Sequence, residues 1–123
     1  MPPTKKPDPD DFFLRWPGSR TLVEMLADKW TIPIIHSLAR GVRRPGELRR
    51  ELNGVSQKML TQTLRSLEQR GVVLRKVYST LPPHVEYMLT PLGESLDQPL
   101  AALCEWSRQH AEELGWPGEK KEG

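Results

Sequence analysis

The sequence predicts a mainly α-helical domain with one small β-hairpin, an α+β fold. Apolar residues recur at helical spacing in five segments between residues 19 and 114. The segments rich in β-branched and aromatic residues are two neighbouring runs, 72–78 and 85–89. A length of 123 residues suits one domain with a single core.

The composition limits where this domain works. No apolar run approaches the roughly 18 residues of a membrane span, and residues 1–11 lack the apolar centre of a signal peptide. We therefore expect a cytoplasmic protein with no membrane partner. The one cysteine, Cys104, excludes an internal disulfide.

The first 18 residues contain five prolines among charged residues, so no helix can run through them. Phe12, Phe13 and Trp16 are too apolar for a purely solvated tail. We expect residues 1–18 to be an arm that is flexible or docked. The folded domain should span 19–114, and a disordered tail should follow over 115–123.

Two helices come next. Ser19 is the expected N-cap of a helix that ends near Ala27. Residues 28–30 form a junction, and a second helix runs to about Ala39, with Pro33 tolerated in its first turn.

A third, short helix begins at Pro45 and ends near Leu52, and Asn53-Gly54 then signals a turn. The helix that follows, residues 56–70, places three leucines on one narrow arc: Leu60, Leu64 and Leu67. The opposite face carries Lys, Gln, Thr and Arg without a carboxylate, since Glu68 lies nearer the apolar edge. An acid-free face suits a nucleic-acid groove, and helix, short turn, helix is the pattern of a helix-turn-helix.

Runs 72–78 and 85–89 predict a hairpin with a proline-braced loop, and a hairpin in this place is a wing. Thr90-Pro91 then starts a last helix that carries apolar residues as far as Leu114. Because Pro99 interrupts its hydrogen bonds, we expect a kink or break near residues 97–98.

Charge supports nucleic-acid binding. Residues 40–78 hold ten basic residues against three acidic ones, a balance of +7, whereas residues 79–123 sum to −5. A basic surface is what phosphate binding requires, because affinity for nucleic acid comes largely from released counterions.

Other chemistry fits poorly. The three histidines are scattered, and neither a metal-ligand spacing nor a phosphate-loop or nucleophile motif is present, so we expect no enzyme, no metal and no cofactor. The main alternative is a winged helix that binds another protein and not specific DNA. Aromatic residues such as Trp30 and Trp106 could line a pocket for a small effector, although we favour a core role.

Several motifs, in order, resemble the HxlR-type winged helix-turn-helix transcriptional regulators. They are Asp28-Lys29-Trp30-Thr31, Gly46-Glu47-Leu48-Arg49-Arg50, Gly54-Val55-Ser56-Gln57-Lys58-Met59-Leu60-Thr61, Pro83-His84-Val85-Glu86-Tyr87, Thr90-Pro91-Leu92-Gly93 and Leu103-Cys104-Glu105-Trp106.

This resemblance implies a homodimer that binds double-stranded DNA at an inverted-repeat operator, with repression as the expected effect. Helix 56–70 would be the recognition helix in the major groove, where Arg65 could pair with guanine, and residues 79–84 the wing tip on the flanking backbone or minor groove. The expected DNA contacts are Arg44, Ser56, Gln57, Lys58, Thr61, Gln62, Arg65, Lys76 and His84. The expected dimer contacts are Leu22, Leu96, Leu100, Leu103 and Trp106.

One departure concerns regulation. Many relatives carry a redox-sensing cysteine just before the first helix, but residues 16–20 of this chain contain none. Cys104 is the only thiol. We expect it to be a small buried apolar residue, with redox sensing as the minor alternative.

Overall fold

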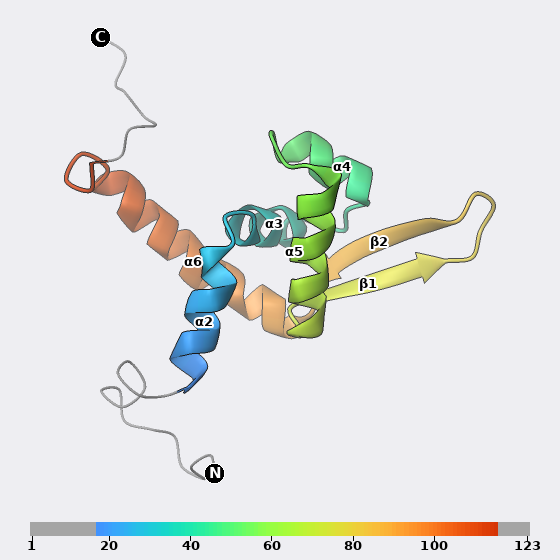
Figure 1. Cartoon of the computed structure of the whole chain (residues 1–123), viewed down its shortest axis with the longest axis horizontal. Coiled ribbons are helices and arrows are strands. Elements are labelled where there is room, and N and C mark those ends of the chain that lie inside the picture. Colours follow the sequence, from blue (N-terminus) through green and yellow to red (C-terminus); the bar gives the residue numbers. More distant parts are fainter. Residues whose placement is uncertain (1–16, 116–123) are drawn as a thin grey trace.

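The computed structural model describes residues 17–115, with side chains from Arg20 onward. Five helices and one hairpin follow each other in this part of the chain (Figure 1): α2 (Pro17–Ala27), α3 (Thr31–Ala39), α4 (Pro45–Glu51), α5 (Gln57–Gln69), β1 (Val73–Tyr78), β2 (His84–Leu89) and α6 (Pro91–Gln109). The predicted fold class and order of elements are confirmed. Residues 1–16 of the predicted arm, with Phe12 and Phe13, and residues 116–123 of the predicted tail lie outside the described residues. The last two residues of the predicted arm, Pro17 and Gly18, belong to α2, and Gly115 lies in a turn.

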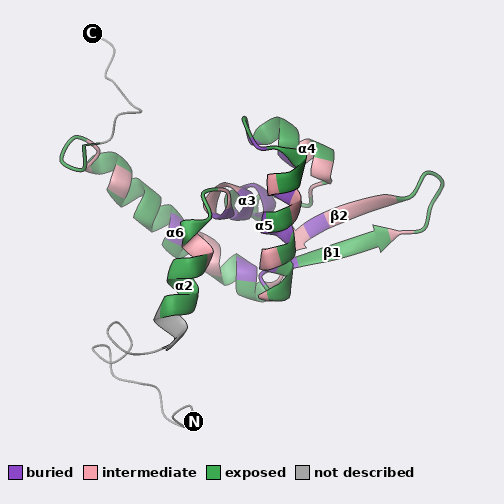
Figure 2. Ribbon diagram, in the orientation of Figure 1, coloured by how far each residue is buried: buried purple, intermediate pink, exposed green. Residues whose placement is uncertain are grey.

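Helix α3 is the centre of the domain, because it contacts α2, α4, α6 and β2. Its Ile34 and Ile35 are fully buried, as is Leu48 of α4. The predicted leucine stripe of α5 completes this core, and Figure 2 shows buried segments on both α3 and α5. One face of α5 is therefore fixed by apolar packing.

Three helices begin as their sequences predict. Pro45 is the first residue of α4, and the Glu47 carboxylate accepts the backbone N–H of Arg44 at 2.8 Å. Ser56 caps α5, and Thr90 caps α6, each accepting a backbone N–H three residues ahead at 3.1 Å. Helix α2 differs, since it begins at Pro17 and places Ser19 inside the helix. A proline suits the first helical turn, so the predicted N-cap at Ser19 was wrong.

Of the kink or break expected near residues 97–98, the break does not occur in α6. The helix runs unbroken over 19 residues, with Pro99 inside it. Leu96 and Leu100, on either side of the proline along one face, pack against the core and hold both halves in place. The helix ends at Gln109, and turns occupy the stretch to Gly115, so Leu114 is not part of it.

The hairpin projects away from the helices (Figure 1). Its strands pair antiparallel from Val73↔Leu89 to Tyr78↔His84, with residues 79–83 as the loop. At its root, Arg43 and Tyr87 exchange two backbone hydrogen bonds of 3.0 and 2.8 Å. The residues before α4 thus extend the hairpin by one antiparallel bridge.

Gly93 shows how closely α6 approaches the start of the hairpin. A Cβ atom at this position would lie 2.2 Å from the carbonyl oxygen of Val72. Thr90 reinforces the approach, because its backbone N–H donates to that same oxygen at 3.1 Å and its hydroxyl donates to the Gly71 carbonyl at 2.6 Å. The start of the hairpin and α6 are therefore so close that position 93 has no room for a side chain.

Candidate nucleic-acid interface

Helix α5 presents the predicted polar face to solvent. Gln57, Lys58, Gln62 and Arg65 are exposed, while Thr61 is half-buried and accepts a hydrogen bond from Gln57 at 3.1 Å. The acid-free description needs one correction, because Glu68 is also exposed. Glu68 lies with Arg65 on the side of α5 that faces the hairpin, where both side chains line a polar hollow.

The position of α5 is fixed by a polar contact that the sequence did not reveal. The buried hydroxyl of Thr63 donates to the carboxylate of Asp28 at 2.7 Å. The other oxygen of Asp28 accepts the backbone N–H of Trp30 at 2.8 Å. Asp28 therefore ties the beginning of α3 to the middle of α5, which gives a physical role to part of the Asp28-Lys29-Trp30-Thr31 motif.

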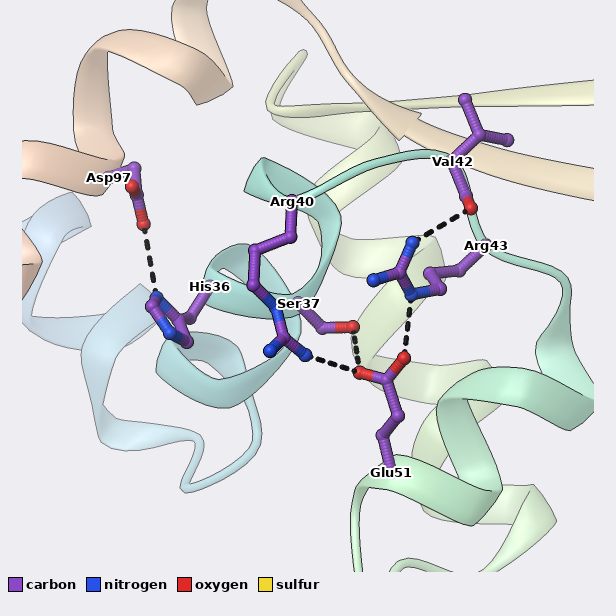
Figure 3. A network of polar contacts seen from close by, with 7 residues as sticks. All are labelled: His36, Ser37, Arg40, Val42, Arg43, Glu51 and Asp97. Atoms are coloured by element: carbon purple, nitrogen blue, oxygen red, sulfur yellow. Dashed lines mark hydrogen bonds and ion pairs between the residues drawn. The ribbon is translucent and has the colours of Figure 1, made fainter.

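A second polar network joins α3 to the end of α4 (Figure 3). The Glu51 carboxylate accepts hydrogen bonds from Ser37 at 2.5 Å, Arg43 at 2.6 Å and Arg40 at 3.1 Å. These contacts, the Ser37 hydroxyl first and the Arg43 guanidinium second, hold the pKa of Glu51 below its ordinary value. Arg40 and Arg43, two of the ten basic residues in the central segment, are thus engaged within the protein.

The remaining basic residues near α4 and α5 are more accessible. Arg44, Arg49 and Arg50 are exposed on or beside α4, and Lys58 and Arg65 are exposed on α5. Ser56, at the start of α5, uses its hydroxyl oxygen as the N-cap. The predicted contacts of α4 and α5 therefore lie on or beside the two helices of the helix-turn-helix.

The two predicted wing contacts lie in different settings. Lys76 is exposed on β1, with its ammonium 5.0 Å from the Tyr78 ring centroid. His84 is the first residue of β2 and not part of the loop. Its ring stacks on Tyr78 at 4.5 Å, and its Nε2 lies 3.6 Å from Glu86. His84 is therefore engaged by neighbours at the base of the wing tip.

The predicted dimer residues fall into two groups. Leu103 and Trp106 are 56% and 52% exposed on α6, and Leu22 on α2 is 37% exposed. Leu100 is only 3% exposed, and Leu96 packs against the core. Helical spacing indicates which residues share a face, but not how much of that face the same chain covers. Leu100 thus belongs to the core of the single chain.

Cys104 also differs from the prediction, because it is exposed in the single chain. It lines a mainly apolar hollow of about 380 Å³ between α3 and α6, together with Ile32, Pro33 and Leu100. Two pairs, His36–Asp97 at 3.7 Å and Arg108–Glu105 at 2.8 Å, also border it. The expected burial of Cys104 does not occur within one chain.

Residues 17–115 contain neither a metal-ligand cluster nor a membrane-spanning helix. In that range no three His, Cys, Asp or Glu side chains come together as metal ligands. Nor is any helix of the described range long and apolar enough to cross a membrane.

Comparison with known proteins decides the family. The family model described as HxlR-like helix-turn-helix matches residues 25–114. The chain belongs to this HxlR-like family. The match begins in α2 and ends beyond α6, so it includes the whole helix-turn-helix, the hairpin and the last helix.

Relatives of this HxlR-like protein are regulators by name. It is 46% identical over 88 residues to the HTH-type transcriptional regulator YtfH of Escherichia coli, covering 72% of this chain and 70% of the relative. It is 43% identical over 102 residues to YkvN of Bacillus subtilis, with 83% and 86% covered.

Solved structures of transcriptional regulators have a similar fold. The putative transcriptional regulator ytfH from Salmonella typhimurium superimposes with a TM-score of 0.70 at 42% identity, over 78% of this chain and 86% of that one. The redox regulator HypR in its reduced form gives 0.73 at 33% identity, over 80% and 97%. The HxlR-like chain is accordingly a DNA-binding transcriptional regulator with a winged helix-turn-helix fold.

Proposed function

We propose that this protein is a cytoplasmic, homodimeric repressor, without enzymatic activity, that binds an inverted-repeat operator. Helix α5 lies in the major groove, and the wing tip, residues 79–84, contacts the flanking backbone or the minor groove. The observation that carries this proposal is the exposed face of α5, where Gln57, Lys58, Gln62 and Arg65 stand opposite a fully packed leucine stripe.

The rigidity of that face favours sequence reading. Base contacts need side chains held in register with the groove, and α5 is held by its leucines, by the Ser56 cap and by the Thr63–Asp28 hydrogen bond. Gln62 is exposed near the middle of the helix, and a glutamine can bind adenine with two hydrogen bonds. Arg44, Arg49 and Lys58 add positive charge for the phosphates on either side.

Dimer formation is supported by the apolar surface left on α2 and α6. Leu22, Val23, Leu103 and Trp106 are large apolar side chains that solvent reaches in the single chain. Two such protomers related by a two-fold axis would present two α5 helices to successive major grooves, which matches an inverted repeat.

The alternative, a module that binds another protein, has one observation in its favour. Leu74, Val77 and Leu81 of the hairpin are at least half exposed, so the wing carries apolar surface that a protein partner could cover. The basic balance of residues 40–78 argues for DNA.

The test begins with selection of bound fragments from a genomic DNA pool, followed by measurement of Kd on the selected operator and on a scrambled sequence. We expect an inverted repeat, a preference of at least about 10³ for the operator, and a fall in affinity of orders of magnitude between about 50 and 200 mM salt. Gln62→Ala should reduce the preference more than it reduces binding to scrambled DNA. Binding that is insensitive to salt, with no enriched sequence, would favour the protein-contact alternative.

A further inference from the structure

A polar hollow of about 310 Å³ lies where the recognition helix meets the wing. Thr61, Arg65 and Glu68 line it from α5, and Arg75 and Tyr87 line it from the two strands. Glu68, Arg75 and Tyr87 were not among the residues that the sequence assigned to DNA binding. The hollow therefore combines residues of helix α5 with residues of the hairpin that had no expected role in DNA binding.

Two elements bring these residues together for clear geometric reasons. Thr61, Arg65 and Glu68 follow one another at spacings of four and three, so they form one stripe along α5. Arg75 pairs directly with Tyr87 in the hairpin register, and paired residues of an antiparallel ladder share a face. Lys76, the next residue of β1, consequently points to the opposite face.

The hollow is rich in hydrogen-bond donors that the protein itself does not use. Within residues 17–115, neither Arg65 nor Arg75 forms an ion pair, and the Tyr87 hydroxyl has no hydrogen-bond partner. The Thr61 oxygen accepts from Gln57, which leaves its own O–H to donate. Two guanidinium groups and two hydroxyls thus converge on one space.

Such a donor set fits a group with several acceptor oxygens and negative charge. Arginine binds phosphate through two parallel N–H···O bonds, and hydroxyls donate to the same oxygens. At about 310 Å³ the hollow is far larger than the space that one water needs, so a phosphate group can enter it.

We infer that this hollow binds one backbone phosphate of the operator, held by Arg65 from the recognition helix and Arg75 from the wing. The inference rests on the proposed DNA binding and deepens it. It changes the role of Arg65, since a guanidinium that holds a phosphate does not read the guanine expected from the sequence. The shared phosphate couples the position of the wing to that of α5 on the duplex.

Glu68 limits the strength of this site. Its carboxylate lines the same hollow, so it attracts the two guanidinium groups in the free protein and repels the phosphate in the complex. Glu68→Gln should accordingly tighten binding to operator and scrambled DNA alike.

The experiment compares full-length dimers carrying Arg65→Ala, Arg75→Ala or Lys76→Ala, on the selected operator and on scrambled DNA. Lys76→Ala removes the same charge one residue along β1, but from the other face. We expect the two arginine variants to weaken both DNAs by the same factor, about tenfold or more, and to lower the salt slope by about one. Lys76 is itself an expected DNA contact, so Lys76→Ala should also weaken binding, but through a different phosphate.

A second measurement uses the wild-type protein and DNA in which single phosphates are replaced by neutral methylphosphonates. One position should weaken wild-type binding and leave Arg75→Ala binding unchanged. Arg75→Lys, which keeps the charge, should retain most of the affinity. That result would show that the hairpin tolerates a substitution at this position and still folds.

The outcomes separate the two proposals. If the wild-type protein binds an operator, but no methylphosphonate position loses its effect in Arg75→Ala while keeping it in Lys76→Ala, the phosphate site is refuted and the regulator stands. If Arg65→Ala weakens binding to the operator but not to scrambled DNA, Arg65 contacts a guanine base and does not hold the phosphate, and the inference is wrong for this residue. If the wild-type protein binds no DNA, both proposals fall.

Discussion

Replacement of Glu51 by glutamine tests the link between α3 and the segment that leads into α4. The substitution keeps the shape of the side chain and one carbonyl acceptor, but removes the charge that holds Ser37, Arg40 and Arg43 together (Figure 3). Hydrogen bonds to charged groups stabilise proteins by about 1.5–3 kcal/mol, whereas exposed ion pairs contribute about 0–1 kcal/mol.

The magnitude follows from the partial exposure of this network. The Glu51 side chain is 30% exposed and that of Arg43 is 19% exposed, while that of Arg40 is 58% exposed. The Arg40 pair should therefore contribute little, and the Ser37 and Arg43 contacts most of the effect. We expect Glu51→Gln to lower the free energy of unfolding by about 1–2 kcal/mol, or the Tm by roughly 4–8 °C.

The dependence on pH provides a second signature. The pKa of Glu51 is lowered on folding from an ordinary value of 4.5, so its contribution is complete above that value and is lost as the pH falls through the folded-state pKa. The stability difference between wild type and variant should be constant from about pH 6 to 8 and should shrink below about pH 4.5.

Urea unfolding followed by circular dichroism, at one fixed protein concentration, measures this difference. Glu47→Gln is the matched control, since Glu47 also accepts a hydrogen bond but only from the Arg44 backbone. A difference for Glu51→Gln that is below about 0.3 kcal/mol at pH 7, or that does not shrink as the pH falls below 4.5, would refute the proposed role of the network.

Three further substitutions probe other parts of the fold. Gly93→Ala should destabilise the protein by about 1–3 kcal/mol in thermal unfolding, because its methyl group would meet the Val72 carbonyl; an unchanged Tm would contradict the close approach. Thr63→Val should cost about 1 kcal/mol and weaken operator binding, since Asp28 loses a hydrogen bond; equal affinity would mean that α5 does not need this anchor. Trp106→Ser should shift light scattering from about twice 14.1 kDa toward the monomer mass, and an intact dimer at micromolar concentration would exclude Trp106 from the interface.

The sequence predicted the elements well where local rules decide them. Ser56 and Thr90 cap their helices, Pro45 starts α4, and the leucines of α5 lie in the core, because capping chemistry and helical period act within a few residues. Pro99 shows the limit of such rules. Its local cost is overridden by packing on both sides, which depends on residues far away in the sequence.

Contacts between distant segments could not be predicted in this way. The Thr63–Asp28 hydrogen bond joins residues 35 positions apart, and the hollow containing Arg75 exists only because a helix stripe meets a strand face. The helical wheel placed Glu68 near the apolar edge of α5, but the structure leaves it exposed beside Arg65. For the same reason, a leucine at a given helical position could not be assigned to the core or to a dimer interface, as Leu100 and Leu103 show.

The antiparallel bridge between Arg43 and Tyr87 has a consequence for how such a regulator can be switched. It fastens the wing to the entrance of α4, while the start of α6 is fastened to the start of the wing through Thr90 and Val72. Wing, α4 and α6 are therefore linked by backbone hydrogen bonds, and bending the wing alone would have to break them. If the proposed dimer binds an inverted repeat, we expect its release to occur through a change in the separation of the two α5 helices, which must match about 34 Å per turn of the duplex.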